Sequence, residues 1–311
     1  MVGYGEVPVF PGLSAETIEN VEDCLKGLKT GFDSASEELI GLPSSVHFGI
    51  EMALNDLYNG GSGLIFPSSY TKGETVIDIN GLIWMGSLEE MKERIKEKID
   101  EDYRCIKVKI GAIDWEDEMR LLEYIRNNGR IDLILRVDAN GALPEDDYMP
   151  YLNDLAHFEI HSIEQPIRHG QPYKMRELCE KSPVRVALDE ELIGVPPGDE
   201  RETLLETIKP DFIVIKPALC YGFKGSNDWI ELAEAKGIGW WITSALESSI
   251  GLNAIAQFTG MKNTTVTQGL GTGSLYLNNL PSPLSLNRDC LFYSGQSVQQ
   301  YKSSMESLPW R

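Results

Sequence analysis

The chain has 311 residues, of which 42% are hydrophobic and 24% charged, a globular composition with room for one large barrel and an appendage or for two medium domains. Its formal net charge of −20 works against binding nucleic acid or an anionic membrane, so we expect a small-molecule partner. The five cysteines are an odd number without CxxC spacing and no run is apolar enough to span a bilayer, which predicts a cytoplasmic protein.

The first part of the chain, residues 1–74, lacks a regular alternation of strands and helices. It begins with a loop rich in proline and glycine between Gly3 and Gly12. Apolar residues at helical spacing then predict one helix near Ser14–Leu28 and a longer one near Ser44–Tyr58. We interpret this part as an incomplete capping domain with a linking helix.

From residue 75 onward, short runs rich in β-branched residues alternate with amphipathic helical stretches, as in a chain of parallel strands with crossover helices. The predicted strands are Thr75–Trp84, Cys105–Ile110, Leu133–Asp138, His161–Pro166, Arg185–Asp189, Phe212–Lys216, Trp240–Ser244 and Thr264–Gln268. The predicted helices are Leu88–Asp102, Trp115–Asn127, Tyr148–Phe158, Tyr173–Lys181, Asp228–Lys236 and Ile250–Thr259.

Eight such strands with intervening helices favour a closed barrel over an open doubly wound sheet. A dinucleotide-binding fold is disfavoured because no GxGxxG motif follows the first strand. The sequence therefore predicts an α/β fold, a (β/α)7β TIM-like barrel over residues 75–273 with a small α+β capping domain. Residues 274–311, with a hairpin-like stretch at Ser285–Tyr293, are expected to return to the capping domain.

Charged side chains occur near the carboxyl ends of five consecutive predicted strands, where barrel enzymes place their active sites. Three adjacent strands each end in a carboxylate, and the strands on either side carry lysines. A single carboxylate after a strand is often a helix N-cap, but a lysine within an apolar strand is costly unless it is paired or functional. In chain order, the residues are Lys107, Lys109, Asp138, Glu164, Asp189 and Lys216.

The three carboxylates Asp138, Glu164 and Asp189 would repel one another strongly at a common rim unless a cation lay among them. Oxygen ligands suit a hard divalent ion, so we predict a Mg²⁺ site, with Mn²⁺ as a substitute. The lysines would then face each other across a small carboxylate substrate bound to the metal.

The motifs at these positions resemble the enolase superfamily, specifically its muconate-lactonizing branch. The matching segments read Lys-Val-Lys, Val-Asp-Ala-Asn, Ile-Glu-Gln-Pro, Leu-Asp-Glu-Glu and Ile-Lys-Pro. The runs Thr243–Leu252 and Gln268–Gly273 are similar to segments of the o-succinylbenzoate synthases in that branch. The resemblance runs from Gly3–Val7 to Pro281. Because the family's first capping strands and mobile loop do not precede it, we expect the N-terminal part of the capping domain to be truncated.

The resemblance implies a metal-dependent hydro-lyase of menaquinone biosynthesis. Its reaction would be the syn-dehydration of 2-succinyl-6-hydroxy-2,4-cyclohexadiene-1-carboxylate to o-succinylbenzoate through a metal-stabilised enediolate. The resemblance assigns the metal-ligand role to the three carboxylates and the general-base role to Lys109. Lys107 would lie beside Lys109 and favour its neutral form, and Lys216 would make a charge contact on the opposite face.

Four further polar residues are candidates for substrate contact. Asn140 follows the third predicted strand within the Val-Asp-Ala-Asn motif. Ser244, Glu247 and Ser248 follow the seventh strand, where they could contact the succinyl side arm.

Two other functions fit parts of the same sequence. An N-acylamino-acid racemase or dipeptide epimerase of this branch also needs two lysines on opposite faces of its substrate. A non-catalytic barrel scaffold would keep the fold without the chemistry, although the complete lysine and carboxylate set argues against it. The sequence leaves the oligomeric state open.

Overall fold

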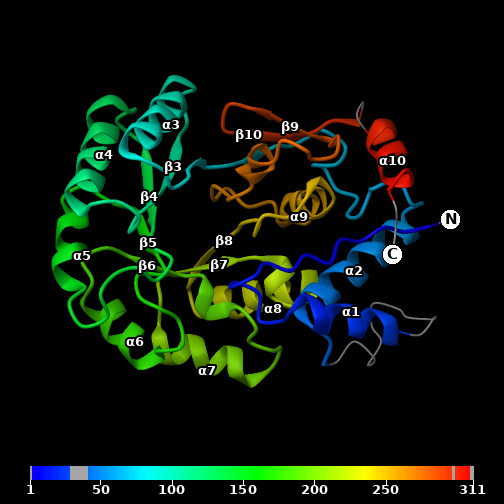
Figure 1. Ribbon diagram of the computed structural model, residues 1–311, viewed down its shortest axis with the longest axis horizontal. Coiled ribbons are helices and arrows are strands. Elements are labelled where there is room, and N and C mark those ends of the chain that lie inside the picture. The colour runs from blue at the N-terminus through cyan, green and yellow to red at the C-terminus, as the bar shows by residue number, and fades with distance from the viewer. Residues whose placement is uncertain (1, 29–40, 296–297, 309–311) are drawn as a thin grey trace.

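The computed structural model describes residues 2–28, 41–295 and 298–308. The strands of its larger sheet are parallel, and they lie side by side in the order in which they occur in the chain (Figure 1). Parallel neighbours in strict sequence order, each joined through a helix, are the arrangement of a (β/α) barrel. The strands are β2 (Gly81–Ile83), β3 (Cys105–Lys109), β4 (Ile134–Asp138), β5 (Ser162–Glu164), β6 (Val186–Leu188), β7 (Phe212–Ile215) and β8 (Gly239–Ile242).

Seven helices, one after each strand of this sheet, form the outer layer. Figure 1 shows α3 to α7 around the outside of the curved sheet. Three of them begin with a side-chain cap from the preceding residue, namely α3, α4 and α9, and at α3 Ser87 and Glu90 form a capping box. The helices are α3 (Leu88–Asp100), α4 (Trp115–Asn128), α5 (Met149–Ala156), α6 (Pro172–Lys181), α7 (Asp199–Ile208), α8 (Gly222–Ala235) and α9 (Ser249–Lys262).

These elements confirm the predicted α/β barrel class, and six of the seven helices match predicted ones. Helix α7 was not predicted. The eighth predicted strand, Thr264–Gln268, is wrong in extent, since its place is taken by two single bridges, Ile79 to Gln268 and Thr243 to Gly269. The Thr-Thr-Val run has strand propensity, but Thr265 and Val266 are exposed outside the ladder, so context overrides propensity there.

The first predicted strand, Thr75–Trp84, is two strands in two different sheets. Its first half is β1 (Ile77–Asp78), which pairs antiparallel with β10 (Cys290–Tyr293). Its second half is β2, which starts the barrel. The division follows the hydrogen bonds, because Ile79 N donates to Asp289 O whereas Asn80 N donates to Gln268 O.

The described segments near the two termini lie beside the barrel rather than within it (Figure 1). The predicted hairpin is present, formed by β9 (Leu284–Asn287) and β10. The last helix, α10 (Val298–Glu306), places the ring of Tyr301 against Gly63, where an added Cβ would lie 2.4 Å from the ring. The C-terminal segment thus reaches a loop that precedes the barrel (Figure 1).

The N-terminal helices are α1 (Ile18–Gly27) and α2 (Ser44–Tyr58), close to the predicted ranges. Buried Glu51 of α2 accepts hydrogen bonds from the backbone N–H groups of Phe223 and Lys224 and so fixes α2 to the start of α8. Residues 2–10 form no strand, although they resemble the end of a sheet. They lie against α2 so closely that a Cβ on Gly5 would be 2.0 Å from Gly49 O.

Candidate active site

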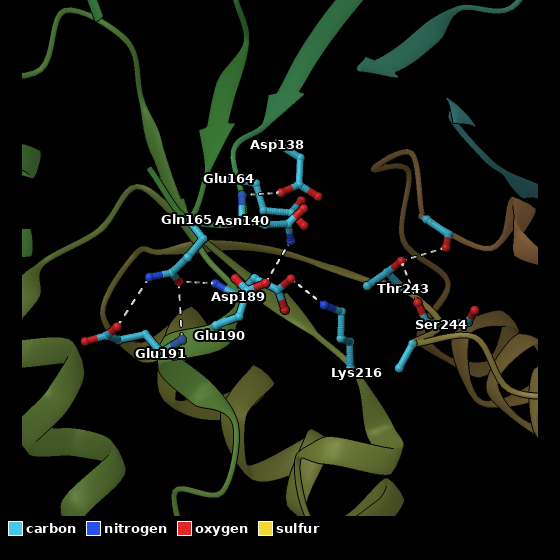
Figure 2. Close-up of polar contacts among 12 residues, drawn as sticks. Asp138, Asn140, Glu164, Gln165, Asp189, Glu190, Glu191, Lys216, Thr243 and Ser244 are labelled. Atoms are coloured by element: carbon cyan, nitrogen blue, oxygen red, sulfur yellow. Dashed lines mark hydrogen bonds and ion pairs between the residues drawn. The ribbon is translucent and has the colours of Figure 1, made fainter. Parts of the chain in front are cut away.

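The three predicted carboxylates come together at one rim of the barrel. Asp138 ends β4, Glu164 ends β5, and Asp189 directly follows β6 (Figure 2). Asp138 and Glu164 are register partners on neighbouring strands. All three side chains are at most 2% exposed, so their charges interact in a medium that screens them weakly.

The lysines of β3 lie next to these carboxylates. Lys107 Nζ is 2.9 Å from Asp138 Oδ2 and 3.0 Å from Glu164 Oε1. Lys109 Nζ is 2.7 Å from the same Asp138 oxygen and donates to Asn140 Oδ1 at 2.6 Å. Alternation along the strand therefore puts both ammonium groups inside the barrel, as predicted.

Lys216 follows β7 and forms an ion pair with Asp189. Burial alone lowers the pKa of Lys216, but the neighbouring carboxylates of Asp189 and Glu190 raise it above its ordinary value. Likewise, burial lowers the pKa of Lys107 while Asp138 and Glu164 raise it more. Both residues therefore remain cations in this arrangement.

Burial and neighbouring charges shift the pKa values of the three carboxyl groups in different directions. Burial first, and then the Asp138 carboxylate, raise the pKa of Glu164. Burial also opposes ionisation of Asp138, but Lys107 and Lys109 bring the pKa of Asp138 well below its usual range. Burial raises the pKa of Asp189 as well. The two lysines thus favour the ionised form of Asp138, whereas burial and the Asp138 charge favour the protonated form of Glu164.

The donor set fits a hard divalent cation. Asp189 Oδ1 and Glu190 Oε2 are buried without a hydrogen-bond partner among the described residues, and such orphaned oxygens call for a proton or a cation. Within those residues, no three acidic, histidine or cysteine side chains already have the spacing of a metal site. The carboxylates instead form ion pairs with the ammonium groups of Lys107 and Lys216. Their assignment as metal ligands therefore stays a prediction.

A cavity of about 190 Å³ opens beside the carboxylates and lysines. It is lined by predicted residues from five strand ends, namely Lys107, Lys109, Asn140, Glu164, Lys216 and Ser244. Asn140 Nδ2 also donates to Glu190 Oε1 at 2.8 Å, which ties the loop after β4 to the turn after β6 (Figure 2). Leu82 and Trp84 add apolar surface to the wall of the cavity, and Leu82 is the register partner of Lys107.

Several lining residues were not singled out from the sequence. Asn80, Leu82 and Trp84 alternate along the segment that leads into and through β2, and Lys109 Nζ lies 5.6 Å from the centroid of the Trp84 ring. That alternation was visible in the sequence, but nothing marked which face looks inward. Leu13 reaches the cavity from the N-terminal loop, a contact that no local pattern predicts.

Gln165 is a second residue that the sequence did not single out. Its Oε1 accepts hydrogen bonds from the backbone N–H groups of Asp189 and Glu191, and its Nε2 donates to Ile167 O (Figure 2). The side chain therefore holds the turn that presents Asp189. The Glu-Gln-Pro motif contained it, but its contacts are with a strand that comes 24 residues later.

The three candidates after β8 have different positions. Ser244 lines the cavity, and its hydroxyl is hydrogen-bonded to that of Thr272. Ser248 caps α9 by accepting from Ile250 N, and its own hydroxyl donates to Glu6. Glu247 is fully buried and accepts from the backbone N–H groups of Ala245 and Leu246. Neither Glu247 nor Ser248 lines the cavity.

Glu247 gives a pH-dependent prediction. Burial first, and then the nearby Glu6 carboxylate, raise the pKa of Glu247 from 4.5 to about 7. Because the folded-state value is the higher one, its contribution to stability is present below pH 4.5 and is lost as the pH rises through 7. We expect Glu247→Gln to be more stable than the wild type at pH 8, by up to about 3 kcal/mol, and equal at pH 4.5 in urea unfolding.

The control for this prediction is Glu93→Gln, which neutralises an exposed glutamate of α3. This variant should show the same difference in free energy of unfolding between pH 4.5 and pH 8 as the wild type. A Glu247→Gln variant with the same pH dependence as the wild type would show that Glu247 is already ionised in the fold without penalty.

None of the helices in the described ranges is long and apolar enough to cross a membrane. The fold and the site together define a (β/α)-barrel protein with a lysine and carboxylate centre at the carboxyl ends of its strands. Comparison with known proteins identifies the family, since residues 90–281 match the Enolase C-terminal domain-like family. The chain belongs to this family and to the enolase superfamily, which confirms the resemblance inferred from its motifs.

Comparison with individual proteins of the family gives more specific similarities. Over 78% of its length, the chain is 50% identical to an o-succinylbenzoate synthase of Desulfotalea psychrophila, and the match spans 66% of that relative, slightly less than two thirds. The crystal structure of MenC from the same organism superposes with a TM-score of 0.79 at 41% identity, covering 93% of this chain and 90% of that one. An L-Ala-D/L-Glu epimerase of Bacillus subtilis is 24% identical over 96% of this chain and 82% of its own.

Proposed function

We propose that this protein is an o-succinylbenzoate synthase, a hydro-lyase that dehydrates 2-succinyl-6-hydroxy-2,4-cyclohexadiene-1-carboxylate in menaquinone biosynthesis. The observation that carries the proposal is a cavity lined by Lys109 and Lys216, with three buried carboxylates at the strand ends around it. The 50% identity to a synthase selects this reaction among those that such a site could support.

Lys109 is the general base in this proposal. The proton to be removed lies on the carbon next to the substrate carboxylate and is only weakly acidic, so the base must be neutral and aligned with it. Asn140 Oδ1 and Asp138 Oδ2 each hold Lys109 Nζ, which fixes the amine at the cavity wall. After accepting the proton, Lys109 returns it to the hydroxyl group that departs from the same face, so that water leaves and the ring becomes aromatic.

Lys216 and Lys107 act as fixed positive charges. Both are cationic in this arrangement because neighbouring carboxylates raise the pKa of each lysine. A preorganised cation next to growing negative charge stabilises the transition state without having to reorient. Dehydration on one face needs no second proton transfer, so a permanently charged Lys216 is compatible with it.

Asp138, Glu164 and Asp189 would hold a Mg²⁺ ion, for which Mn²⁺ is a substitute. Bound there, the ion supplies positive charge for the negative charge that develops on the substrate carboxylate. The orphaned Asp189 Oδ1 and the burial of all three carboxylates at neighbouring strand ends support this set of ligands. We further propose that the protein works in the cytoplasm, a location with which its five free cysteines agree.

Metal removal tests the proposed function. We expect o-succinylbenzoate to form when Mg²⁺ is present, and its formation to fall by at least about a hundredfold after dialysis against EDTA. Added Mg²⁺ should restore the rate, and Mn²⁺ should do so in part. A rate that does not respond to EDTA, or no product from either this chain or an N-terminally extended version, would contradict the proposal.

An N-acylamino-acid racemase or dipeptide epimerase is the alternative that the epimerase relative and the two opposed lysines support. Solvent deuterium exchange at the α-carbon of N-succinyl amino acids measures that activity directly. An exchange rate far above the dehydration rate would favour the racemase. A non-catalytic scaffold would bind no Mg²⁺ in a titration.

A further inference from the structure

Gln165 directly follows Glu164 at the end of β5 and is fully buried. Its backbone has a φ of +39°, in the left-handed region that few residues other than glycine adopt. Strained backbone of this kind persists only where the surrounding structure holds it, and it is concentrated at functional sites. Gln165 does not line the cavity, so any role in the chemistry must act through a neighbour.

The backbone of Gln165 joins the segments on either side of it. Its N–H donates to Ala187 O of β6 at 2.8 Å, and its carbonyl accepts from Gly141 N, in the loop after β4, at 2.7 Å. These two bonds fix Gln165 between the segments that carry Asp138 and Asp189. The residue therefore has a defined position relative to all three carboxylates.

The side-chain amide of Gln165 uses both of its donors and accepts two hydrogen bonds (Figure 2). Its Oε1 accepts from the backbone N–H groups of Asp189 at 3.1 Å and Glu191 at 3.2 Å. Its Nε2 donates to Ile167 O at 3.0 Å and to Glu191 Oε2 at 3.3 Å. Because backbone N–H groups can only donate, the amide oxygen must face them, and the orientation of the amide is fixed.

The hydrogen bond from Glu191 replaces a cap that Asp189 would ordinarily supply. Asp189 is the N-cap of the short 3₁₀ helix Glu190–Leu192, and an N-cap aspartate usually accepts from the second or third backbone N–H of its helix. The side chain of Asp189 makes no such bond. Instead, Gln165 Oε1 accepts from the second N–H, which is that of Glu191.

This exchange of caps leaves the Asp189 carboxylate free for other partners. Its Oδ2 pairs with Lys216, and its Oδ1 is buried with no hydrogen-bond partner among the described residues. Resting on the proposed function and its metal ligands, we propose that Gln165 is a positioning residue, which caps this turn in place of Asp189 and keeps the Asp189 carboxylate available to Mg²⁺. Without Gln165, the N–H of Glu191 needs another acceptor, and the Asp189 carboxylate is the group that usually serves.

Gln165→Met removes the donors and the acceptor and keeps the length of the side chain. We expect it to weaken Mg²⁺ binding by about 10- to 100-fold in isothermal titration, the usual cost of removing a residue that orients a metal ligand. In the Gln165→Met background, Asp189→Asn should weaken Mg²⁺ binding by a smaller factor than it does in the wild type, because the two residues act through one another. A purely structural role of Gln165 would leave the effect of Asp189→Asn the same in both backgrounds.

Gln257→Met is the matched control. Gln257 is also fully buried, its Oε1 accepts from the backbone N–H groups of Ile65 and Phe66, and its Nε2 donates twice. It does not line the cavity. This variant should lower the Tm about as much as Gln165→Met does, because it loses the same kinds of hydrogen bond, and it should leave the Mg²⁺ affinity unchanged.

Gln165→Asn is the second variant and decides the question if the methionine variant does not fold. Asparagine adopts the left-handed backbone more readily than most residues, but its side chain is one methylene shorter, so its amide cannot reach the N–H of Glu191 from the same backbone position. We expect the same loss of Mg²⁺ affinity as for Gln165→Met, with a smaller loss of stability in urea unfolding.

Equal weakening of Mg²⁺ binding by Gln165→Met and Gln257→Met would overturn the inference, as would unchanged Mg²⁺ binding by a folded Gln165 variant or a wild type that binds no Mg²⁺. The dehydration assay decides the proposed function separately. Since Mg²⁺ titration needs no turnover, a wild type that forms no o-succinylbenzoate but binds Mg²⁺ in a manner that depends on Gln165 and Asp189 would refute the activity and keep the role of Gln165.

Discussion

Lys109→Ala is expected to lower kcat for o-succinylbenzoate formation by at least about a thousandfold, because it removes the amine that takes the proton. Lys107 cannot replace it, since its Nζ is held by Asp138 and by both oxygens of Glu164. Lys216 approaches from another strand and is paired with Asp189. The rate of product formation under saturating Mg²⁺ is the measurement that checks this.

The same variant should still bind Mg²⁺, since all three carboxylates remain. Isothermal titration with Mg²⁺ therefore separates loss of the base from loss of the metal site. Lys96→Ala, which removes an exposed lysine of α3 paired with Asp100, is the matched control and should leave kcat unchanged. Normal turnover by Lys109→Ala would refute the assignment of the base.

The strand-end residues could be predicted because their signal is periodic and local. A strand alternates its side chains, so the position of Lys109 fixed that of Lys107, and each carboxylate followed an apolar run. Chain order then sufficed to bring them together, because neighbouring strands of a parallel barrel are also neighbours in sequence. The structure reproduces that order from β3 to β7.

The features that could not be predicted from the sequence depend on contacts between distant segments of the chain. Glu247 was predicted to contact the substrate, but it is buried outside the cavity, and Glu6 from the other end of the chain accepts hydrogen bonds from the backbone N–H groups of the helix that follows. The eighth strand was overestimated because a β-branched run was interpreted without knowing that it lies outside the ladder.

Glu164→Gln is expected to abolish Mg²⁺-dependent activity while leaving the metal-free fold intact. Glu164 lies on the middle strand of the three that carry carboxylates, so its replacement by a neutral amide removes the central anionic ligand. We expect Mg²⁺ affinity to fall by at least about a hundredfold, in line with the loss of one charged ligand from a hard-cation site. Titration calorimetry of the variant and the wild type measures this.

The stability of the same variant should move in the opposite direction. Burial and Asp138 raise the pKa of Glu164 in the metal-free fold, so its contribution to stability is present below the unfolded value and is lost as the pH rises through the folded one. A neutral glutamine avoids that loss. At pH 8 the metal-free variant should therefore unfold at a urea concentration equal to or higher than that for the metal-free wild type. Added Mg²⁺ should reverse this order, because Mg²⁺ stabilises only the protein that binds it. A variant that is less stable than the wild type without metal would mean that Glu164 serves chiefly as a partner of Lys107, and the three carboxylates would then be a structural ion-pair network rather than a metal site.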